Sequence, residues 1–236
     1  QGRIAADNIF GRPVRYTGSL GTAVVRVFGL AAACTGASEK YLRQAGLRYE
    51  ALHLHPFSNA GYYPGAEPIS MKILFDPATG RLLGAQAVGR KGVDKRIDVL
   101  ATAIQGGLTI DDVAELELAY APPFGSAKDP VNVAGMAAQN VLRGDVRQIQ
   151  WHELPGLDAA QTLLLDVRSL EERAAGCIPG SVHVPLPQLR DRYTELPRDK
   201  EIVVYCQSGQ RSYYACRFLV QRGYTVRNLS GSYKTW

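Results

Sequence analysis

Hydrophobic residues are arranged differently in the first and last parts of the chain. In residues 1–144, segments rich in β-branched and apolar residues predict strands, and apolar residues three and four positions apart predict helices. The strands are expected at 22–28, 70–75 and 82–88, and the helices at 38–45, 94–105, after Thr109 and at 130–142. Pro77 and Gly80 supply the backbone angles of a tight turn, so the last two strands form a hairpin. Strands and helices do not alternate regularly, which is typical of an α+β domain.

The C-terminal part has a clearer pattern. Residues 163–167 and 201–205 are short, continuous apolar runs, which indicate strands buried on both faces of a parallel sheet. A helix is expected at 212–222, with Ala215, Phe218 and Leu219 on its buried face and Gly223 at its end. Because residues 143–150 are polar, we expect two domains, 1–144 and 149–236, the second of them α/β with a parallel sheet.

Composition and charge exclude several classes of protein. The 236 residues are 46% hydrophobic and 21% charged, which indicates a folded protein. The net charge of +5 is spread over both parts without a run of five like charges, so we expect no nucleic-acid partner. We also expect no membrane span and no signal peptide, because no window of 18 apolar residues exists and the first residues lack the signal pattern.

The four cysteines lack the spacing of a zinc site or a disulfide scaffold, so we expect no metal, reduced thiols and a cytoplasmic protein. Three of them are expected to be structural. Cys216 lies on the predicted C-terminal helix, Cys177 lies in a Gly-Cys-Ile-Pro segment, and Cys34 ends an apolar run and is expected in the core.

Cys206 is the strongest candidate for chemistry. It follows a predicted buried strand and opens a loop that leads into a helix, where backbone N–H groups and the helix dipole stabilise negative charge. A cysteine in such a nest has a lowered pKa and reacts as a thiolate. Arg211 can add a positive charge and donate to loop carbonyls or to a substrate oxyanion. The expected cradle consists of Gln207, Ser208, Gly209, Gln210 and Ser212.

Four residues separate Cys206 from Arg211, one fewer than in the cradle of cysteine phosphatases, and the smaller loop fits sulfur rather than a phosphoryl group. The loop resembles the active-site loop of rhodanese sulfurtransferases. Further similarity covers nearly all of 150–236, through Asp166-Val167-Arg168 with Glu172, the segment 176–185, and Asn228 to Tyr233 with Trp236. The resemblance implies that Cys206 carries a persulfide, with Asp166 and Arg168 in supporting positions.

Two residues depart from the rhodanese pattern. Cys177 stands where the family usually has His, and Ser232 where it has a second Gly. We expect neither to touch the loop of Cys206, and therefore expect activity to survive.

Aromatic residues and prolines cluster at 55–65 and 118–130. From composition alone they indicate a turn with partly buried rings. Together with Gly2 to Ile9, Gly21-Thr22-Ala23, Thr35-Gly36, Lys95 to Asp98 and Tyr120 to Pro123, they resemble the dimerisation domain of flavin-dependent disulfide reductases of the coenzyme A-disulfide reductase branch. The resemblance places Tyr120 and either Tyr62 or Tyr63 beside coenzyme A and the flavin, and it puts Asn59 where relatives often have His.

The combined resemblance implies a fragment of an FAD- and NAD(P)H-dependent coenzyme A-disulfide, persulfide or polysulfide reductase fused to a sulfurtransferase. The flavin and NADH domains of that family precede this segment, so we expect this chain alone to hold no cofactor. The same resemblance implies a homodimer that forms through residues 1–144. It also implies that the substrates are small sulfur compounds such as thiosulfate, persulfide, polysulfide or coenzyme A persulfide. The alternative is a persulfide carrier, a sensor or a dimerisation module without turnover.

Overall fold

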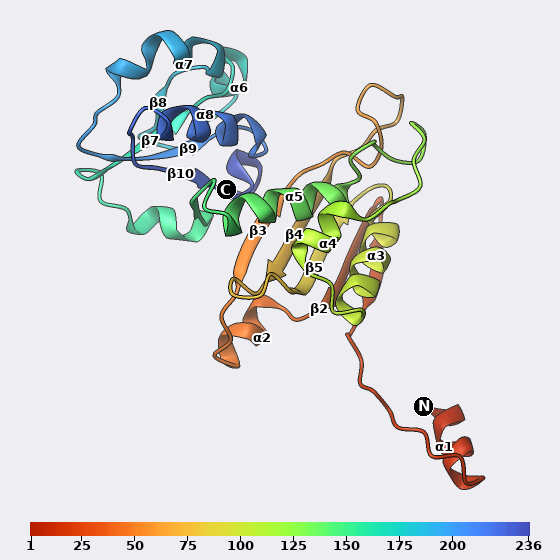
Figure 1. The fold of residues 1–236 in the computed structure, drawn as a ribbon. Helices are drawn as coiled ribbons and strands as arrows, with labels where there is room; N and C mark the ends of the chain where they lie inside the picture. Colours follow the sequence, from red (N-terminus) through yellow and green to blue (C-terminus); the bar gives the residue numbers. More distant parts are fainter.

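The computed structural model describes residues 1–236, which form two groups of elements, each around its own sheet (Figure 1). In the first sheet the strand order is β1-β2-β5-β4-β3 and all neighbours are antiparallel. Its strands are β1 (Ala23–Val27), β2 (Leu30–Gly36), β3 (Glu50–Leu54), β4 (Ile69–Phe75) and β5 (Leu82–Gly89). The strand expected at 22–28 and the hairpin formed by 70–75 and 82–88 are confirmed.

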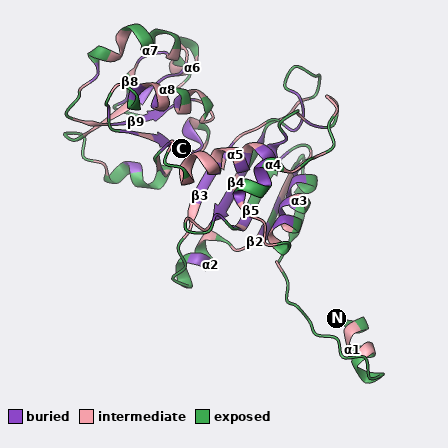
Figure 2. Cartoon of the chain, in the orientation of Figure 1, coloured by how far each residue is buried: buried purple, intermediate pink, exposed green.

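Helices cover one face of this sheet (Figure 1). They are α3 (Val93–Gln105), α4 (Ile110–Glu115) and α5 (Pro130–Leu142), while α2 (Glu39–Gln44) follows β2 and α1 (Gly2–Ile9) lies apart with no buried residue (Figures 1 and 2). The helix positions agree with the pattern of apolar residues. Ile97 and Leu100 of α3 are buried against the sheet, and the side chains of Ser38, Thr109 and Asp129 cap α2, α4 and α5. No helix combines the length and the apolar character that a membrane span requires.

The second sheet is parallel, with strand order β6-β10-β9-β7-β8. Its strands are β6 (Gln148–Ile149), β7 (Thr162–Asp166), β8 (Val182–His183), β9 (Glu201–Tyr205) and β10 (Val226–Leu229). Its helices are α6 (Leu170–Ala174), α7 (Leu186–Arg192) and α8 (Gln210–Val220), with short 3-10 helices η1 (Trp151–Gly156), η2 (Tyr193–Glu195) and η3 (Ser232–Lys234).

Strand β9 is buried on both faces, as its continuous apolar sequence predicted. Ile202 and Val204 belong to the core beneath α7 and α8, whereas Val203 and Tyr205 belong to a smaller core on the opposite face. Helix α8 begins at Gln210, two residues before the predicted start. The loop after β9 is therefore short, and it is enclosed between the strand and the first turn of α8.

The second domain covers the β3 edge of the first sheet. Gln150 Nε2 donates to the Ala51 carbonyl at 2.7 Å, and the His53 amide donates to Ser230 Oγ at 3.0 Å. His55 Nε2 lies 2.9 Å from Thr235 Oγ1. Because an open strand edge exposes unpaired backbone groups, these contacts both join the domains and protect β3.

The contact between the domains is expected to weaken in acid. Burial, and then the nearby Lys72, lowers the pKa of His53 from 6.5 to about 4, and burial with Lys234 lowers that of His55 to about 4. Protonation therefore favours separated domains: the contact is fully stable above pH 6.5 and is lost progressively as pH falls toward 4. Small-angle scattering should show an increasing radius of gyration over this interval. The double variant His53→Gln/His55→Gln should remove the pH dependence, whereas His152→Gln, at an exposed histidine, should retain it.

Candidate active site

Cys206 lies where β9 ends, at the centre of the loop that leads into α8. The turn requires Gly209, whose φ of 107° is in a region that other residues rarely adopt. Gln210 then begins α8, and its side chain donates to Tyr214 Oη at 2.9 Å, away from Cys206. The predicted strand, loop and helix arrangement is present.

The sulfur of Cys206 receives hydrogen bonds from the loop. The Gly209 amide donates to Sγ at 3.1 Å, and the Ser212 hydroxyl lies 3.5 Å from it. Burial of Cys206, which is 1% exposed, would raise the pKa of its thiol, but hydrogen bonds from the Ser212 side chain and the amides of Ser212, Gly209 and Ser208 outweigh it. The net effect is a lowered pKa, as expected for a reactive thiolate.

Ser232 contacts Cys206, and the expectation that it lies away from the loop was wrong. Its Oγ accepts a hydrogen bond from the Cys206 amide at 3.1 Å and lies 3.8 Å from Sγ. The contact arises because η3 folds back onto the loop, where the Tyr233 amide donates to the Cys206 carbonyl and the Lys234 amide to that of Gln207, each at 3.1 Å.

Arg211 is held by a carboxylate. Its two terminal nitrogens donate to the Glu172 oxygens at 2.7 and 2.6 Å. The pair lowers the pKa of Glu172, mainly through the hydrogen bonds from Arg211. The structure shows no hydrogen bond from Arg211 to a loop carbonyl. The pair with Glu172 fixes the guanidinium at the start of α8, and Glu172 and then Cys206 raise the pKa of Arg211, which keeps its positive charge.

Asp166 and Arg168 form a buried ion pair beneath the loop. Asp166 is fully buried and Arg168 is 1% exposed, with Nη2 to Oδ2 at 2.8 Å and Nε to Oδ1 at 3.0 Å. Arg168 also approaches Gln207 Oε1 at 3.4 Å, and its Cζ lies 4.0 Å from the centre of the Tyr233 ring. The pair thus supports both the first cradle residue and η3.

The other three cysteines differ in their surroundings. Cys216 belongs to the core of the second domain, and burial raises the pKa of its thiol, so it is structural as expected. Cys177 is partly buried. Cys34 is exposed, and the expectation that it lies in the core was wrong: its neighbours Ala33 and Thr35 point inward, and the alternation of a strand turns Cys34 to the other face.

The structure distinguishes the two adjacent tyrosines of the first domain. Tyr62 Oη lies 3.4 Å from Tyr120 Oη, whereas the structure shows no hydrogen bond to the Tyr63 hydroxyl. Tyr62 is therefore the member of the pair that is brought to Tyr120. Asn59, fully buried, accepts hydrogen bonds from Ser58 at 3.0 Å and from Lys91 at 3.3 Å.

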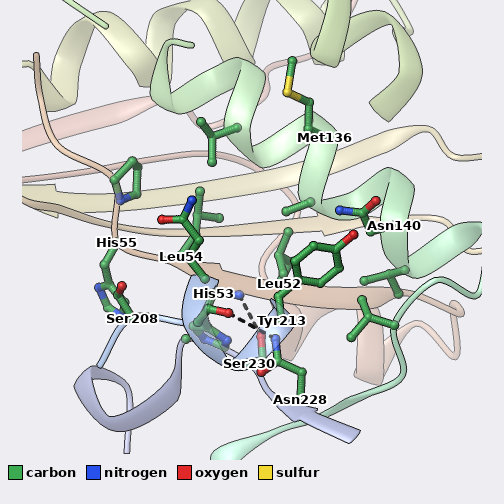
Figure 3. Close-up of a pocket in the computed structure, with 18 of the residues that line it drawn as sticks. Leu52, His53, Leu54, His55, Met136, Asn140, Ser208, Tyr213, Asn228 and Ser230 are labelled. Atoms are coloured by element: carbon green, nitrogen blue, oxygen red, sulfur yellow. Dashed lines mark hydrogen bonds between the residues drawn. The ribbon is translucent and has the colours of Figure 1, made fainter. Parts of the chain in front are cut away.

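A cavity of about 420 Å³ between the domains was not predicted. One side is formed by β3 and α5, with His53 and Asn140, and the other by β10, α8 and the Cys206 loop from Ser208 to Gln210 (Figure 3). Its lining comes from segments far apart in sequence, and no local pattern identifies such a set. The cavity places the first domain directly beside the cradle.

Comparisons with known proteins agree with this arrangement. A family model for the pyridine nucleotide-disulphide oxidoreductase dimerisation domain matches residues 22–130, and one for the rhodanese-like domain matches residues 152–236. The chain therefore joins these two domain families. The fold class expected from the sequence is confirmed, as an antiparallel sheet with helices followed by a parallel rhodanese sheet.

Solved structures share the joined arrangement. A crystal structure of reduced CoADR-RHD from Bacillus anthracis is 48% identical, with a TM-score of 0.96, covering 99% of this chain and 42% of that one. An NAD-dependent persulfide reductase from A. fulgidus is 41% identical, with a TM-score of 0.90, covering all of this chain and 43% of that one. Over nearly its whole length, the chain therefore resembles a part of these two longer proteins that makes up less than half of each.

A curated relative matches the first domain. Coenzyme A disulfide reductase from Staphylococcus aureus is 37% identical over 137 residues, which is 58% of this chain and 31% of that protein. The chain thus spans about a third of the length of the curated relative. The structure contains no group of three or more His, Cys, Asp or Glu side chains arranged to hold a metal ion.

Proposed function

We propose that the rhodanese domain transfers sulfane sulfur through a persulfide on Cys206. The thiolate attacks the outer sulfur of a donor such as thiosulfate: a bond forms between Sγ and that sulfur, and the S–S bond of thiosulfate breaks. Sulfite leaves with the electron pair, and Cys206 becomes a persulfide anion. A thiolate acceptor then attacks the outer sulfur, forming a new persulfide and regenerating the Cys206 thiolate.

The observation that carries this proposal is the donor set around Sγ. The Gly209 amide and the Ser212 hydroxyl stabilise a negative sulfur at the N-terminal end of α8, where the helix dipole acts in the same direction. The loop has four residues between Cys206 and Arg211, one fewer than the cradle that encloses a phosphoryl group in cysteine phosphatases. The smaller loop therefore suits a single sulfur atom.

Mass spectrometry of the chain treated with thiosulfate tests this function. We expect the peptide that contains Cys206 to gain the mass of one sulfur atom, and a small thiol to remove it. Treatment with dithiothreitol before thiosulfate starts every cysteine from the reduced state. The absence of the added sulfur on Cys206, with the protein folded, would contradict the proposal. Repeated turnover with a thiol acceptor distinguishes an enzyme from a carrier that is loaded once.

We further propose that the two domains, residues 1–144 and 149–236, serve a coenzyme A-disulfide, persulfide or polysulfide reductase that uses FAD and NAD(P)H. The relatives named above support this context. In it, Tyr62 and Tyr120 are the tyrosines that face coenzyme A and the flavin, because their hydroxyls adjoin. We expect this chain alone to hold neither FAD nor NAD(P)H. The transfer proposed for Cys206 moves one sulfane sulfur from a donor to a thiolate acceptor, and that exchange needs no external oxidant or reductant.

The same context includes a homodimer formed through the first domain. All five residues of β1 are exposed, among them Val24, Val25 and Val27, and Phe28 at the hairpin tip is 98% exposed. An apolar edge strand of this kind favours burial against another surface. Analytical ultracentrifugation measures the association. The proposed compartment is the cytoplasm, whose reducing conditions keep the Cys206 thiol available.

A further inference from the structure

The backbone of Ser232 is unusual for a buried residue. Its φ is 56°, and the only other non-glycine residue with positive φ is Phe28, at an exposed hairpin tip. Ser232 itself is fully buried. A left-handed conformation costs free energy for any residue with a Cβ atom, and glycine would avoid that cost. A serine at this position therefore needs a compensating role for its hydroxyl.

The Ser232 hydroxyl lies beside Cys206 and contacts the groups around its sulfur. Ser232 Oγ accepts from the Cys206 amide at 3.1 Å, and it is the only hydrogen-bond partner that this amide has. Because this bond uses an oxygen lone pair, the Ser232 proton remains available to donate. The acceptors within reach are Ser212 Oγ at 3.2 Å, the Leu229 carbonyl at 3.4 Å and Cys206 Sγ at 3.8 Å.

Ser232 and Ser212 form a short chain toward the sulfur. The Ser212 hydroxyl lies 3.5 Å from Sγ and 3.0 Å from the Gly209 carbonyl, and it donates to one of them at a time. When Ser232 donates to Ser212 Oγ, that bond polarises the Ser212 hydroxyl and strengthens its donation to a negative sulfur. The arrangement favours the thiolate over the thiol, because a thiolate accepts the hydrogen bond from Ser212 that the Ser232 hydroxyl strengthens.

We propose that Ser232 is a positioning residue for the sulfurtransferase reaction: it fixes the Cys206 amide and, through Ser212, stabilises the Cys206 thiolate and its persulfide. This role rests on the function proposed for Cys206 and adds to it a residue outside the loop. The neighbouring backbone holds Ser232 in place, since the amides of Tyr233 and Lys234 donate to the carbonyls of Cys206 and Gln207. Ser232 thus keeps the cost of the left-handed conformation and supplies the hydroxyl that glycine at this position would lack.

Two substitutions separate the hydroxyl from the backbone conformation. Ser232→Gly removes the hydroxyl and relieves the conformational cost, so we expect it to melt at the same or a higher temperature. Ser232→Ala removes the hydroxyl and keeps the cost, so it should melt below the glycine variant. In both variants, the pH midpoint for alkylation of Cys206 by iodoacetamide should rise by about half to one unit. The reason is that Ser212, which donates to the thiolate, loses the hydrogen bond from Ser232. Alkylation at a pH below the midpoint should then slow about three- to tenfold.

The measurement follows the Cys206 peptide by mass spectrometry, so that the other three cysteines do not contribute. A purely structural role for Ser232 would change the melting temperatures and leave the pH midpoint at its wild-type value in both variants, which would overturn the inference. A failure of the proposed sulfur transfer gives a different result. The two variants would still have a higher pH midpoint for Cys206 alkylation than the wild-type protein, but the wild-type protein would acquire no sulfur from thiosulfate.

Discussion

Replacing Cys206 with serine should abolish sulfur transfer from thiosulfate to a thiol acceptor, lowering the rate by a factor on the order of 10³ or more. Serine fits the site and still accepts hydrogen bonds from Gly209 and Ser212. Its hydroxyl, however, is not ionised near neutral pH and forms no persulfide. Sulfite release measured at saturating thiosulfate gives the rate. The loss should appear without a change in the thermal melting of the domain beyond a few degrees.

The cysteine that is easiest to reach provides the matched control. Cys34 is exposed on β2, outside the second domain, so Cys34→Ser should retain the full rate. This comparison separates the effect of the nest from that of having any free thiol. A Cys206→Ser protein that kept a tenth of the wild-type rate would show that the sulfur is carried elsewhere in the chain.

Local features of the site could be predicted from the sequence. The apolar run 201–205, the glycine that follows and the apolar face of α8 together predict a strand, a turn and a helix around Cys206, and the structure has all three. Each feature depends on a few adjacent residues, and backbone preferences act at that range. The start of α8 was misplaced by two residues because Gly209 ends the loop earlier than the polar sequence indicated.

Contacts between distant residues could not be predicted. Glu172 is 39 residues from Arg211, and Ser232 is 26 residues from Cys206, so their pairing depends on how the parallel strands are ordered. The sequence showed that Ser232 departs from the family pattern. It did not show that the Ser232 side chain lies beside the sulfur of Cys206. Cys34 shows a third limit: an apolar run does not reveal which face of a strand each member occupies when both faces carry small residues.

These distant contacts surround the sulfur's own donors, which come from the loop. The loop backbone supplies the amides, which any sequence with the same turn would have. Glu172 accepts from Arg211 and so sets part of the charge beside the loop, and Ser232 accepts from the Cys206 amide and so holds the first amide of the loop. The contacts to Glu172 and Ser232 therefore add to a loop whose own donors, from Ser208, Gly209 and Ser212, lower the pKa of Cys206.

The buried pair of Asp166 and Arg168 is the part of this support with the largest expected effect on stability. Burial alone would raise the pKa of Asp166, but hydrogen bonds from the side chain and amide of Arg168 and from Tyr205 lower it, so the carboxylate stays charged. The Arg168 guanidinium also donates to the Gly176 carbonyl at 2.7 Å. One side chain thus joins β7, the segment after α6 and, through Gln207, the Cys206 loop.

Arg168→Met should therefore destabilise the second domain by about 3–5 kcal/mol, because it leaves the charged, buried Asp166 with only the longer ion pair to Arg173 at 3.4 Å. Urea unfolding followed by tryptophan fluorescence reports this domain alone, since both tryptophans of the chain, Trp151 and Trp236, lie in it. The matched control is Arg192→Met, which breaks an exposed pair with Glu195 and should cost less than about 1 kcal/mol. The stability is lost because the Asp166 carboxylate stays buried and charged after the guanidinium is removed. Adding Asp166→Asn to Arg168→Met removes that charge and should recover part of the lost free energy of unfolding. Equal destabilisation by Arg168→Met and Arg192→Met would show that the buried pair does not hold the site together.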